Sequence, residues 1–210
     1  MPEELLYRNL GLSLSDQYWI NPVESGITWE DVSFFDNNFE QVNAAIQSLP
    51  NAKSGLHAHP NNTSDGNLAK EWIIRDGIRF LRKGGMRRDQ EPFNEVVATA
   101  LHGRLLSPEE FTTYQLDAQG PSPACLCPNF LTDKEEYVPA VYVMREFNQD
   151  ALTSDFDHYL ECCGRLGVRN ERAALERLIV CDDIIANTDR HFRNFGIVRN
   201  VETLECRPAP

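Results

Sequence analysis

The chain has 210 residues, of which 41% are hydrophobic, and a formal net charge of −12 at pH 7. This length suffices for one large domain or two small lobes. The negative charge argues against broad binding to nucleic acids or to anionic membranes, because both attract basic surfaces. No apolar run approaches the roughly 18 residues of a membrane span. We therefore expect no direct nucleic-acid partner and no membrane association.

The N-terminus and the cysteines indicate in which cellular compartment the protein is expected. Met1-Pro2-Glu3-Glu4 is acidic and lacks the basic and then apolar plan of a signal peptide. The six cysteines form no C-x-x-C pair, and several lie in apolar contexts. We expect reduced thiols in a cytoplasmic protein.

Residues 1–50 carry large aromatic side chains at irregular spacing, and a short helix is expected to start near residues 28–32. Because these aromatic residues show no regular spacing, the segment is expected to pack on another surface of the protein and not to form an independent domain. Residues 50–67 have the polar composition of a loop. His57-x-His59 within it has the residue type of a metal site, but no obvious further ligands accompany it. A solvated loop is the favoured interpretation.

A β-hairpin is predicted over residues 70–83. Asp76-Gly77 between two apolar runs is a two-residue turn signal, and it pairs Arg75 with Ile78 and Trp72 with Leu81. One face of the hairpin then ends at Lys83. On pattern alone Lys83 is a lysine at the sheet edge, and the alternative is a cation held for a ligand.

A helix is predicted over residues 91–101, with Pro92 in its first turn. Phe93, Val96, Val97, Ala100 and Leu101 form its apolar stripe, and Glu95 borders that stripe. Glu95 is either a solvated acid that favours the helix dipole or the partner of the strand lysine. Residues 107–135 then contain short strand-like pieces, and residues 137–147 are rich in β-formers, with Pro139 at an edge or bulge.

Two helices are predicted near the C-terminus. Ser154 caps the first, which ends at Gly164 and Gly167, and Asn170 opens the second, which runs to residue 186. Asp182 is a carboxylate among the inward-facing residues of the second helix. A buried carboxylate needs donors, so we expect Asp182 to support the loop that follows, through backbone groups of that loop. A strand over residues 195–199, a turn and a return strand are predicted next.

The loop of residues 187–196 has a spacing with a chemical use. Phosphoryl transfer needs a carboxylate beside the attacking hydroxyl and an oxygen ligand for Mg²⁺, and in protein kinases an Asp and an Asn separated by four residues supply them. Asp189 and Asn194 have that spacing. The alternative interpretation is a helix end with a polar loop.

Asp189-Arg190-His191-x-x-Asn194, after a helix that ends Ile-Ile-Ala-Asn, resembles the catalytic loop of the HipA-like kinases and, more distantly, that of the phosphatidylinositol kinases. Residues 11–20, 63–85, 91–101 and 125–130 resemble further segments of the HipA-like group. The resemblance implies an α+β, protein-kinase-like fold with two lobes. It also implies ATP and Mg²⁺ as cofactors.

The resemblance carries roles onto individual residues. Asp189 is expected to be the base, Asn194 a Mg²⁺ ligand, and His191 a brace of the loop. Lys83, paired with Glu95, is expected to hold the ATP phosphates. The glycine loop is expected at Ser64, Asp65 and Gly66, and the adenine-binding hinge at Cys127 and Asn129.

The resemblance also predicts how the chain is organised into domains. Residues 1–50 form the N-terminal aromatic segment, residues 51–147 the N-lobe, and residues 148–210 a partial C-lobe with the catalytic loop. No Asp follows Asp189, whereas HipA-like proteins have a metal-binding Asp shortly after this point. We expect the 210 residues to end before that Asp, and the uncovered helix 171–186 to promote self-association.

Two functions fit the sequence. The first is a HipA-like, ATP-dependent Ser/Thr protein kinase, or a fragment of one, that is inactive as these 210 residues. Its partners are ATP and a protein substrate. The alternative is a non-catalytic, kinase-like regulatory protein of a toxin–antitoxin or mobile-element system, with an antitoxin-like partner.

Overall fold

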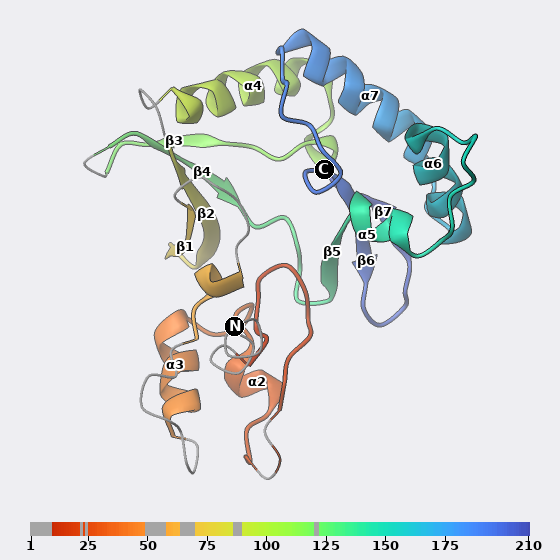
Figure 1. Cartoon of the computed structure of the whole chain (residues 1–210). Helices are drawn as coiled ribbons and strands as arrows, with labels where there is room; N and C mark the ends of the chain where they lie inside the picture. The colour runs from red at the N-terminus through yellow and green to blue at the C-terminus, as the bar shows by residue number, and fades with distance from the viewer. Residues whose placement is uncertain are drawn as a thin grey trace. The chain divides into compact units, whose positions relative to one another are not determined.

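The computed structural model describes residues 10–21, 23, 25–48, 58–63, 70–85, 90–119 and 122–210. The chain forms two compact units. Unit 1 comprises residues 1–97 and 113–133, and unit 2 comprises residues 98–112 and 134–210. Helix α4 (Glu91–Leu105) therefore begins in unit 1 and ends in unit 2. The fold is mixed α/β, with two antiparallel sheets and helices (Figure 1).

Unit 1 contains a four-stranded antiparallel sheet in the order β1-β2-β4-β3. Asp76 and Gly77 join its first two strands, and both have positive φ, 52° and 78°, as a two-residue hairpin turn requires. Trp72 lies opposite Leu81 and Arg75 opposite Ile78, so the predicted register is confirmed. The strands are β1 (Lys70–Arg75), β2 (Ile78–Gly84), β3 (Gln115–Asp117) and β4 (Ala124–Pro128).

The N-terminal part of unit 1 has a hydrophobic cluster of its own. It contains α2 (Trp29–Val32), α3 (Phe39–Gln47) and a 3₁₀ turn, η1 (Pro60–Thr63). Trp72 of β1 packs against the cluster, so the N-terminal segment also covers part of the hairpin. The buried members of the cluster are Leu10, Leu12, Leu14, Val32, Phe34, Val42, Ile46 and Ala58. The assignment of residues 1–50 as a separate segment stays a prediction.

Helix α3 was absent from the sequence-based prediction, although the sequence carries a signal for it. The Asn38 side chain accepts from Gln41 N at 2.8 Å, and the Gln41 side chain accepts from Asn38 N at 2.9 Å. This reciprocal pair is a capping box. Val42 and Ile46, four residues apart, are the buried residues of the helix.

Helix α4 confirms the helix predicted at residue 91, with Pro92 buried in its first turn. The predicted apolar stripe is not core, however. Phe93 is 43% exposed and Val97 68% exposed. A short 3₁₀ turn, η2 (Pro108–Glu110), follows.

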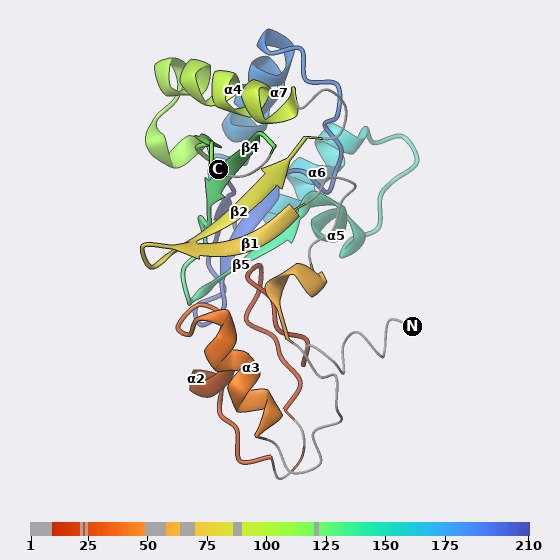
Figure 2. The same ribbon diagram turned by 90° about the vertical axis from the view of Figure 1, so that its left-hand side faces the viewer.

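Unit 2 contains a three-stranded antiparallel sheet in the order β5-β6-β7. Figure 2 labels β5 of this sheet and the helices α5, α6 and α7 of the same unit. The predicted strand, turn and return strand after residue 195 are present as β6 and β7. The elements are β5 (Glu135–Pro139), α5 (Ala140–Arg145), α6 (Asp155–Arg165), α7 (Glu171–Ile184), β6 (Gly196–Asn200) and β7 (Cys206–Pro208). The buried residues of its core are Ala140, Val143, Tyr159, Cys162, Cys163, Leu175 and Ile197.

The β-rich segment predicted over residues 137–147 is only partly a strand. Pro139 ends β5, which is an edge strand, and residues 140–145 form α5 instead. Ala140 N donates to Phe195 O and Val141 N donates to Phe192 O, both at 2.8 Å. These bonds satisfy N–H groups that a helix start leaves open, so tertiary contacts override the β propensity of Val141 and Val143.

The two C-terminal helices begin where the sequence predicted. The Ser154 side chain accepts from Asp157 N at 3.1 Å, and Asn170 precedes α7 at a φ of 62°. Gly164 lies inside α6, and Gly167 lies beyond its end at a φ of 75°. Ile179, Val180 and Ile184 of α7 are exposed. Self-association through this helix stays a prediction.

All six cysteines are free thiols, and Cys206 is the least buried of them. Among the helices that the structure describes, none has both the length and the apolar character needed to cross a bilayer.

Gly196 of β6 lies opposite Pro139 of β5, and a larger residue would not fit there. A Cβ at this position would lie 2.2 Å from Val138 O and 2.9 Å from Pro139 Cα. Backbone atoms cannot move aside cheaply, so Gly196→Ala should lower the free energy of unfolding by about 3 kcal/mol, measured by urea denaturation. Gly164→Ala is the control, because a Cβ there meets nothing within 4 Å and Ala is favoured over Gly inside a helix. Equal effects of the two variants would contradict the close approach.

Candidate active site

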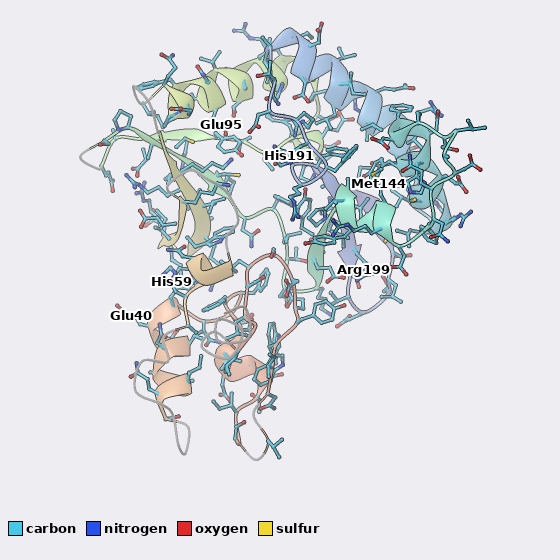
Figure 3. The ribbon with its side chains drawn as sticks, in the orientation of Figure 1. Glu40, His59, Glu95, Met144, His191 and Arg199 are labelled. Carbon is cyan, nitrogen blue, oxygen red and sulfur yellow. The ribbon has the colours of Figure 1, made fainter. Side chains whose placement is uncertain are left out.

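Lys83 lies near the end of β2 and contacts two residues from other elements of unit 1. Its Nζ is 3.3 Å from Glu95 Oε1 on α4 and donates to Tyr114 Oη at 2.6 Å. Figure 3 labels Glu95 on α4. The Lys83–Glu95 ion pair places the strand lysine and the helix acid together, as the second interpretation of Glu95 required. Whether Lys83 contacts phosphate stays a prediction.

The charge on Lys83 is stabilised although the side chain is largely buried. Burial opposes the charge, but the Tyr114 oxygen and the Glu95 carboxylate outweigh it and hold the pKa of Lys83 above its usual value. For Tyr114, burial raises the pKa, and its hydroxyl therefore stays neutral at physiological pH. The result is a permanent cation at a fixed position, which is what a phosphate-binding lysine must supply.

Lys83 shares its sheet face with a second lysine and two thiols. Lys70 of β1 and Cys125 of β4 both lie directly opposite Lys83, and Cys127 lies opposite Leu81. Paired residues of an antiparallel sheet project on the same face. Both thiols are buried, and burial raises the pKa of Cys125 to about 11. Both thiols therefore line this face as buried groups.

The residues expected at the hinge are tied into unit 1. Asn129 N donates to Arg79 O at 2.8 Å, and Asn129 Nδ2 donates to Leu14 O at 3.4 Å. Arg79 in turn donates through Nε to Phe34 O and through Nη2 to Asn37 O. Asn129 therefore clamps the N-terminal segment to the sheet, and its N–H is not available to an adenine ring.

A hollow of about 320 Å³ lies at the opposite end of the hairpin from Lys83. Ile78 and Arg79, next to the turn, line it together with Phe35, Asp36, Asn129, Leu131, Thr132 and Asp133. Lys83 is five residues from Ile78 along β2, roughly 16 Å in an extended strand. This hollow is therefore separate from the group around Lys83.

The loop after α7, in unit 2, is held by Asp182. Asp182 Oδ1 accepts from Asn187 Nδ2 and from Arg190 Nη2, both at 2.8 Å, and Asp182 Oδ2 accepts from Arg190 Nε at 2.6 Å. The guanidinium thus grips both carboxylate oxygens, a strong and directional contact. Asp182 supports the loop as predicted, but its donors are side chains rather than the expected loop backbone.

The same contacts set the charge state of Asp182. Burial by itself would raise the pKa of Asp182, but the hydrogen bonds from Arg190 and Asn187 outweigh burial and hold the pKa below its usual value. Arg190 Nη1 also donates to Asn194 O at 3.2 Å. One arginine therefore connects the end of α7 to the far side of the loop.

The hydrogen bonds that hold Asp189 and Asn194 use the Asp189 backbone and the Asn194 side-chain N–H. The side-chain oxygens of both residues are not used by these bonds. Asn194 Nδ2 donates to Asp189 O at 2.7 Å, and Asp189 N donates to Asn187 Oδ1 at 3.1 Å. In the part of the chain that the structure describes, neither the Asp189 carboxylate nor Asn194 Oδ1 accepts a hydrogen bond. Both residues are exposed. The loop therefore presents a carboxylate and an amide oxygen to solvent.

His191 contributes to the shape of the loop. Its carbonyl accepts from Asn194 N at 2.8 Å, and its Nδ1 accepts from Arg193 N at 3.2 Å. Figure 3 labels this exposed residue. Its position agrees with the expected bracing role, which stays a prediction.

Some expected site residues cannot be placed. Ser64, Asp65 and Gly66, expected in the glycine loop, and His57 lie outside the described residues. His59 stacks its ring edge-on against Phe39, with centroids 4.9 Å apart. Within the described ranges, no group of three or more His, Cys, Asp or Glu residues is arranged to hold a metal ion.

Three contributors were missed at the sequence level. Tyr114 touches Lys83 from 31 positions along the chain, and no local pattern signals such a contact. Arg190 and Asn187 follow Asp182 by eight and five residues and supply its donors. The buried Asp182 was the available signal for them, because a buried carboxylate predicts nearby donors.

Comparison with known proteins gives a structural likeness. No protein-family model matches the chain, and no curated protein sequence matches it. The crystal structure of a Helicobacter pylori proinflammatory kinase, CtkA, matches with a TM-score of 0.54 and 18% sequence identity. The match covers 67% of this chain and 52% of that kinase.

The chain has a kinase-like fold. At 18% identity the likeness extends to the fold alone, and the chain spans about half the length of that kinase. The two-lobed arrangement, the HipA-like assignment, the nucleotide and the substrate remain proposals.

Proposed function

We propose that this chain is the ATP-binding and catalytic part of a HipA-like protein kinase with two lobes, which transfers a phosphoryl group from Mg-ATP to a Ser or Thr of a protein. The observation that carries the proposal is the loop of residues 187–195. Asp182 and Arg190 hold its shape, while the Asp189 carboxylate and Asn194 Oδ1 are left open. A loop that served only to end a helix would have no need of a buried, bidentate ion pair beneath it. The kinase-like fold supports the same assignment.

The residues present fit Mg-ATP in two respects. Lys83, with its charge stabilised by Glu95, suits the phosphates, and Asn194 Oδ1 suits Mg²⁺, which prefers oxygen ligands. Bound Mg²⁺ would neutralise charge on the transferring phosphate. Cys127 lies on the same sheet face as Lys83, where adenine would pack against apolar groups.

The proposed chemistry assigns the proton to Asp189. A substrate hydroxyl oxygen attacks the γ-phosphorus, a new O–P bond forms, and the bond to the leaving ADP oxygen breaks. The hydroxyl proton passes to an Oδ atom of Asp189. Asn194 Nδ2 holds the backbone of Asp189 and so fixes the position of that carboxylate.

A second carboxylate ligand for Mg²⁺ is missing from the loop region. After Asp189 the carboxylates are Glu202 and Glu205, which follow β6. β6 is 5 residues long, roughly 16 Å at ~3.3 Å per residue, so both lie far from Asn194. Glu202 is moreover paired with Lys134 at 3.2 Å. We therefore expect these 210 residues to bind ATP weakly and to transfer phosphate very slowly.

We infer from the pairing of β7 where a second ligand could be added. β7 runs antiparallel to β6, and Ala209 N donates to Gly196 O at 3.0 Å. If the same antiparallel pairing continued, a residue added after Pro210 would lie close to the loop end at Asn194.

A variant with a two-residue Phe-Asp extension after Pro210 should transfer labelled phosphate from ATP to itself or to a protein Ser or Thr at least tenfold faster than the 210 residues. A Phe-Asn extension is the control, because it keeps the shape and removes the charge. Rapid transfer by the 210 residues would show that the second ligand is not needed. Equal rates for both extensions would contradict the proposed metal site.

The braced loop, with its exposed carboxylate and amide oxygen, also fits one other function. A non-catalytic, kinase-like regulatory protein would keep the braced loop and bind a partner, such as an antitoxin-like protein, without turnover. Inactivity of the Phe-Asp variant, together with intact ATP binding, would favour this second function.

A further inference from the structure

The hollow of about 320 Å³ next to the hairpin turn lies outside the candidate active site. Every residue that lines it belongs to unit 1. Its volume is at the small end of the range of ~300–1,000 Å³ for ligand pockets, so it suits one or two side chains of a partner. We call it the hairpin hollow. The lining residues that bear on recognition are Phe35, Asp36, Ile78, Arg79, Leu131 and Asp133.

Part of the lining of the hairpin hollow is apolar. Leu131 is buried, and Phe35 is half-buried. Ile78, at the start of β2, is 52% exposed. Apolar surface of this kind is stabilised when a ligand removes it from water. The hollow therefore favours a ligand with an aliphatic part.

The charged part of the lining is negative in sum. Asp36 and Asp133 are both exposed, and among the described residues no basic side chain lies within ion-pair distance of either carboxylate. Arg79, the cation of the lining, donates through Nε to Phe34 O and through Nη2 to Asn37 O. Burial lowers the pKa of Arg79, and the charge of Asp36 opposes that shift. Two carboxylates against one arginine leave the hollow complementary to a cation.

We propose that the hairpin hollow binds an arginine of a partner protein together with an apolar side chain next to that arginine. Carboxylates bind a guanidinium group in a bidentate manner, and a guanidinium also stacks on an aromatic ring such as that of Phe35. Arginine is enriched among the residues that dominate binding at protein–protein interfaces. The net charge of −12 attracts basic partners in general, and the hollow determines where the arginine docks.

Recognition of the arginine is independent of the proposed kinase function. The hollow and Lys83 lie at opposite ends of the hairpin, so the docked arginine contacts neither Lys83 nor Glu95. Peptide binding is measured without ATP. Absence of ATP binding with arginine binding intact would reject the kinase alone, and the reverse result would reject the docking site alone.

Titration with two small blocked peptides tests the docking site. The probe is acetyl-Leu-Arg-amide, and its match carries citrulline, which keeps the shape of arginine and removes its charge. Amide chemical shifts in NMR spectra of the full chain give both the affinity and the place of binding. At low salt the Arg peptide should bind about fivefold more tightly than the citrulline peptide, with the largest shifts around Ile78 and Asp133.

Variants assign that preference to the two carboxylates. Asp36→Asn/Asp133→Asn should bind the Arg and citrulline peptides equally. Asp76→Asn is the matched control, because Asp76 lies two residues before Ile78 but outside the lining. Its φ is 52°, and Asn is favoured at such a turn position, so the hairpin is kept. Asp76→Asn should retain the preference for arginine. Ile78→Ser keeps both carboxylates and should weaken both peptides alike, by about threefold.

Several results would overturn the docking site. They are equal binding of the two peptides by the unchanged chain, an equal loss of the preference in Asp76→Asn, and chemical shifts centred outside the hollow. Equally tight binding of spermidine would also overturn it, because the hollow would then accept any small polycation. A change of oligomeric state in the double variant, measured by sedimentation, would identify a second copy of the chain as the occupant instead. Circular dichroism melts establish that each variant is folded, and either single variant replaces the double variant if that one unfolds.

Discussion

Asp189→Asn is expected to lower phosphate transfer by about 10³-fold in the variant that carries the added Asp, while ATP affinity stays the same. The substitution keeps the size of the side chain and removes the group that accepts the hydroxyl proton. In the structure the Asp189 side chain makes no hydrogen bond within the described residues, so no structural contact is lost. The loop is held instead through Asp189 N and O.

Asp183→Asn is the control for this measurement. Asp183 is an exposed carboxylate near the end of α7, and its substitution removes the same charge without touching the loop side chains. Labelled-ATP transfer and calorimetry on both variants separate catalysis from binding. A similar loss of transfer in both, or no loss in Asp189→Asn, would remove Asp189 from the role of base.

Asp182→Ala is expected to lower the free energy of unfolding by about 3 kcal/mol. It leaves the Arg190 guanidinium and the Asn187 amide without the acceptor that both share. An ion pair on the protein surface serves as the control for this effect on stability. Glu161→Ala breaks the Arg165–Glu161 contact, which lies on the surface of α6, and should cost less than about 1 kcal/mol. Urea denaturation measures both, and equal costs would contradict a buried brace.

The pH dependence of stability provides a second test of Asp182. Because the folded-state pKa of Asp182 is below its usual value, its stabilising contribution is present above the unfolded pKa and is lost as the pH falls through the folded pKa. Asp182→Asn removes the titrating group. The difference in unfolding free energy between the chain and Asp182→Asn should therefore be largest near neutral pH and should shrink in acid. A constant difference would show that the charge of Asp182 is not responsible.

The hairpin and the C-terminal helices could be predicted because their signals are local. Asp76-Gly77 fixes a two-residue turn, and the turn fixes the register of every pair in the hairpin. Ser154 and Asn170 mark helix starts by the same kind of short-range rule. The helical conformation of residues 140–145 escaped prediction because bonds from the distant residues 192 and 195 decide it.

In the candidate site, too, the residues in local motifs could be predicted and those brought in by the fold could not. Asp189, Asn194 and the pairing of Lys83 with Glu95 could be predicted from spacing and resemblance, since each lies in a recognisable local motif. Tyr114 could not be predicted, because only the fold brings it to Lys83. The contact between Tyr142 of α5 and Arg193 of the loop could not be predicted either, because the two residues are 51 positions apart and no sequence period connects them.

The central claim is that Lys83 and the braced loop belong to a nucleotide-binding kinase fold, and ATP binding in the presence of Mg²⁺ tests it most directly. Isothermal calorimetry on the 210 residues should detect ATP binding, weakened at least tenfold by Lys83→Ala, because a largely buried cation that contacts phosphate is lost. Lys134→Ala should bind ATP like the unchanged chain, since Lys134 is an exposed lysine that pairs with Glu202. Equal ATP affinities of Lys83→Ala and Lys134→Ala, or no ATP binding by the unchanged chain, would contradict the account.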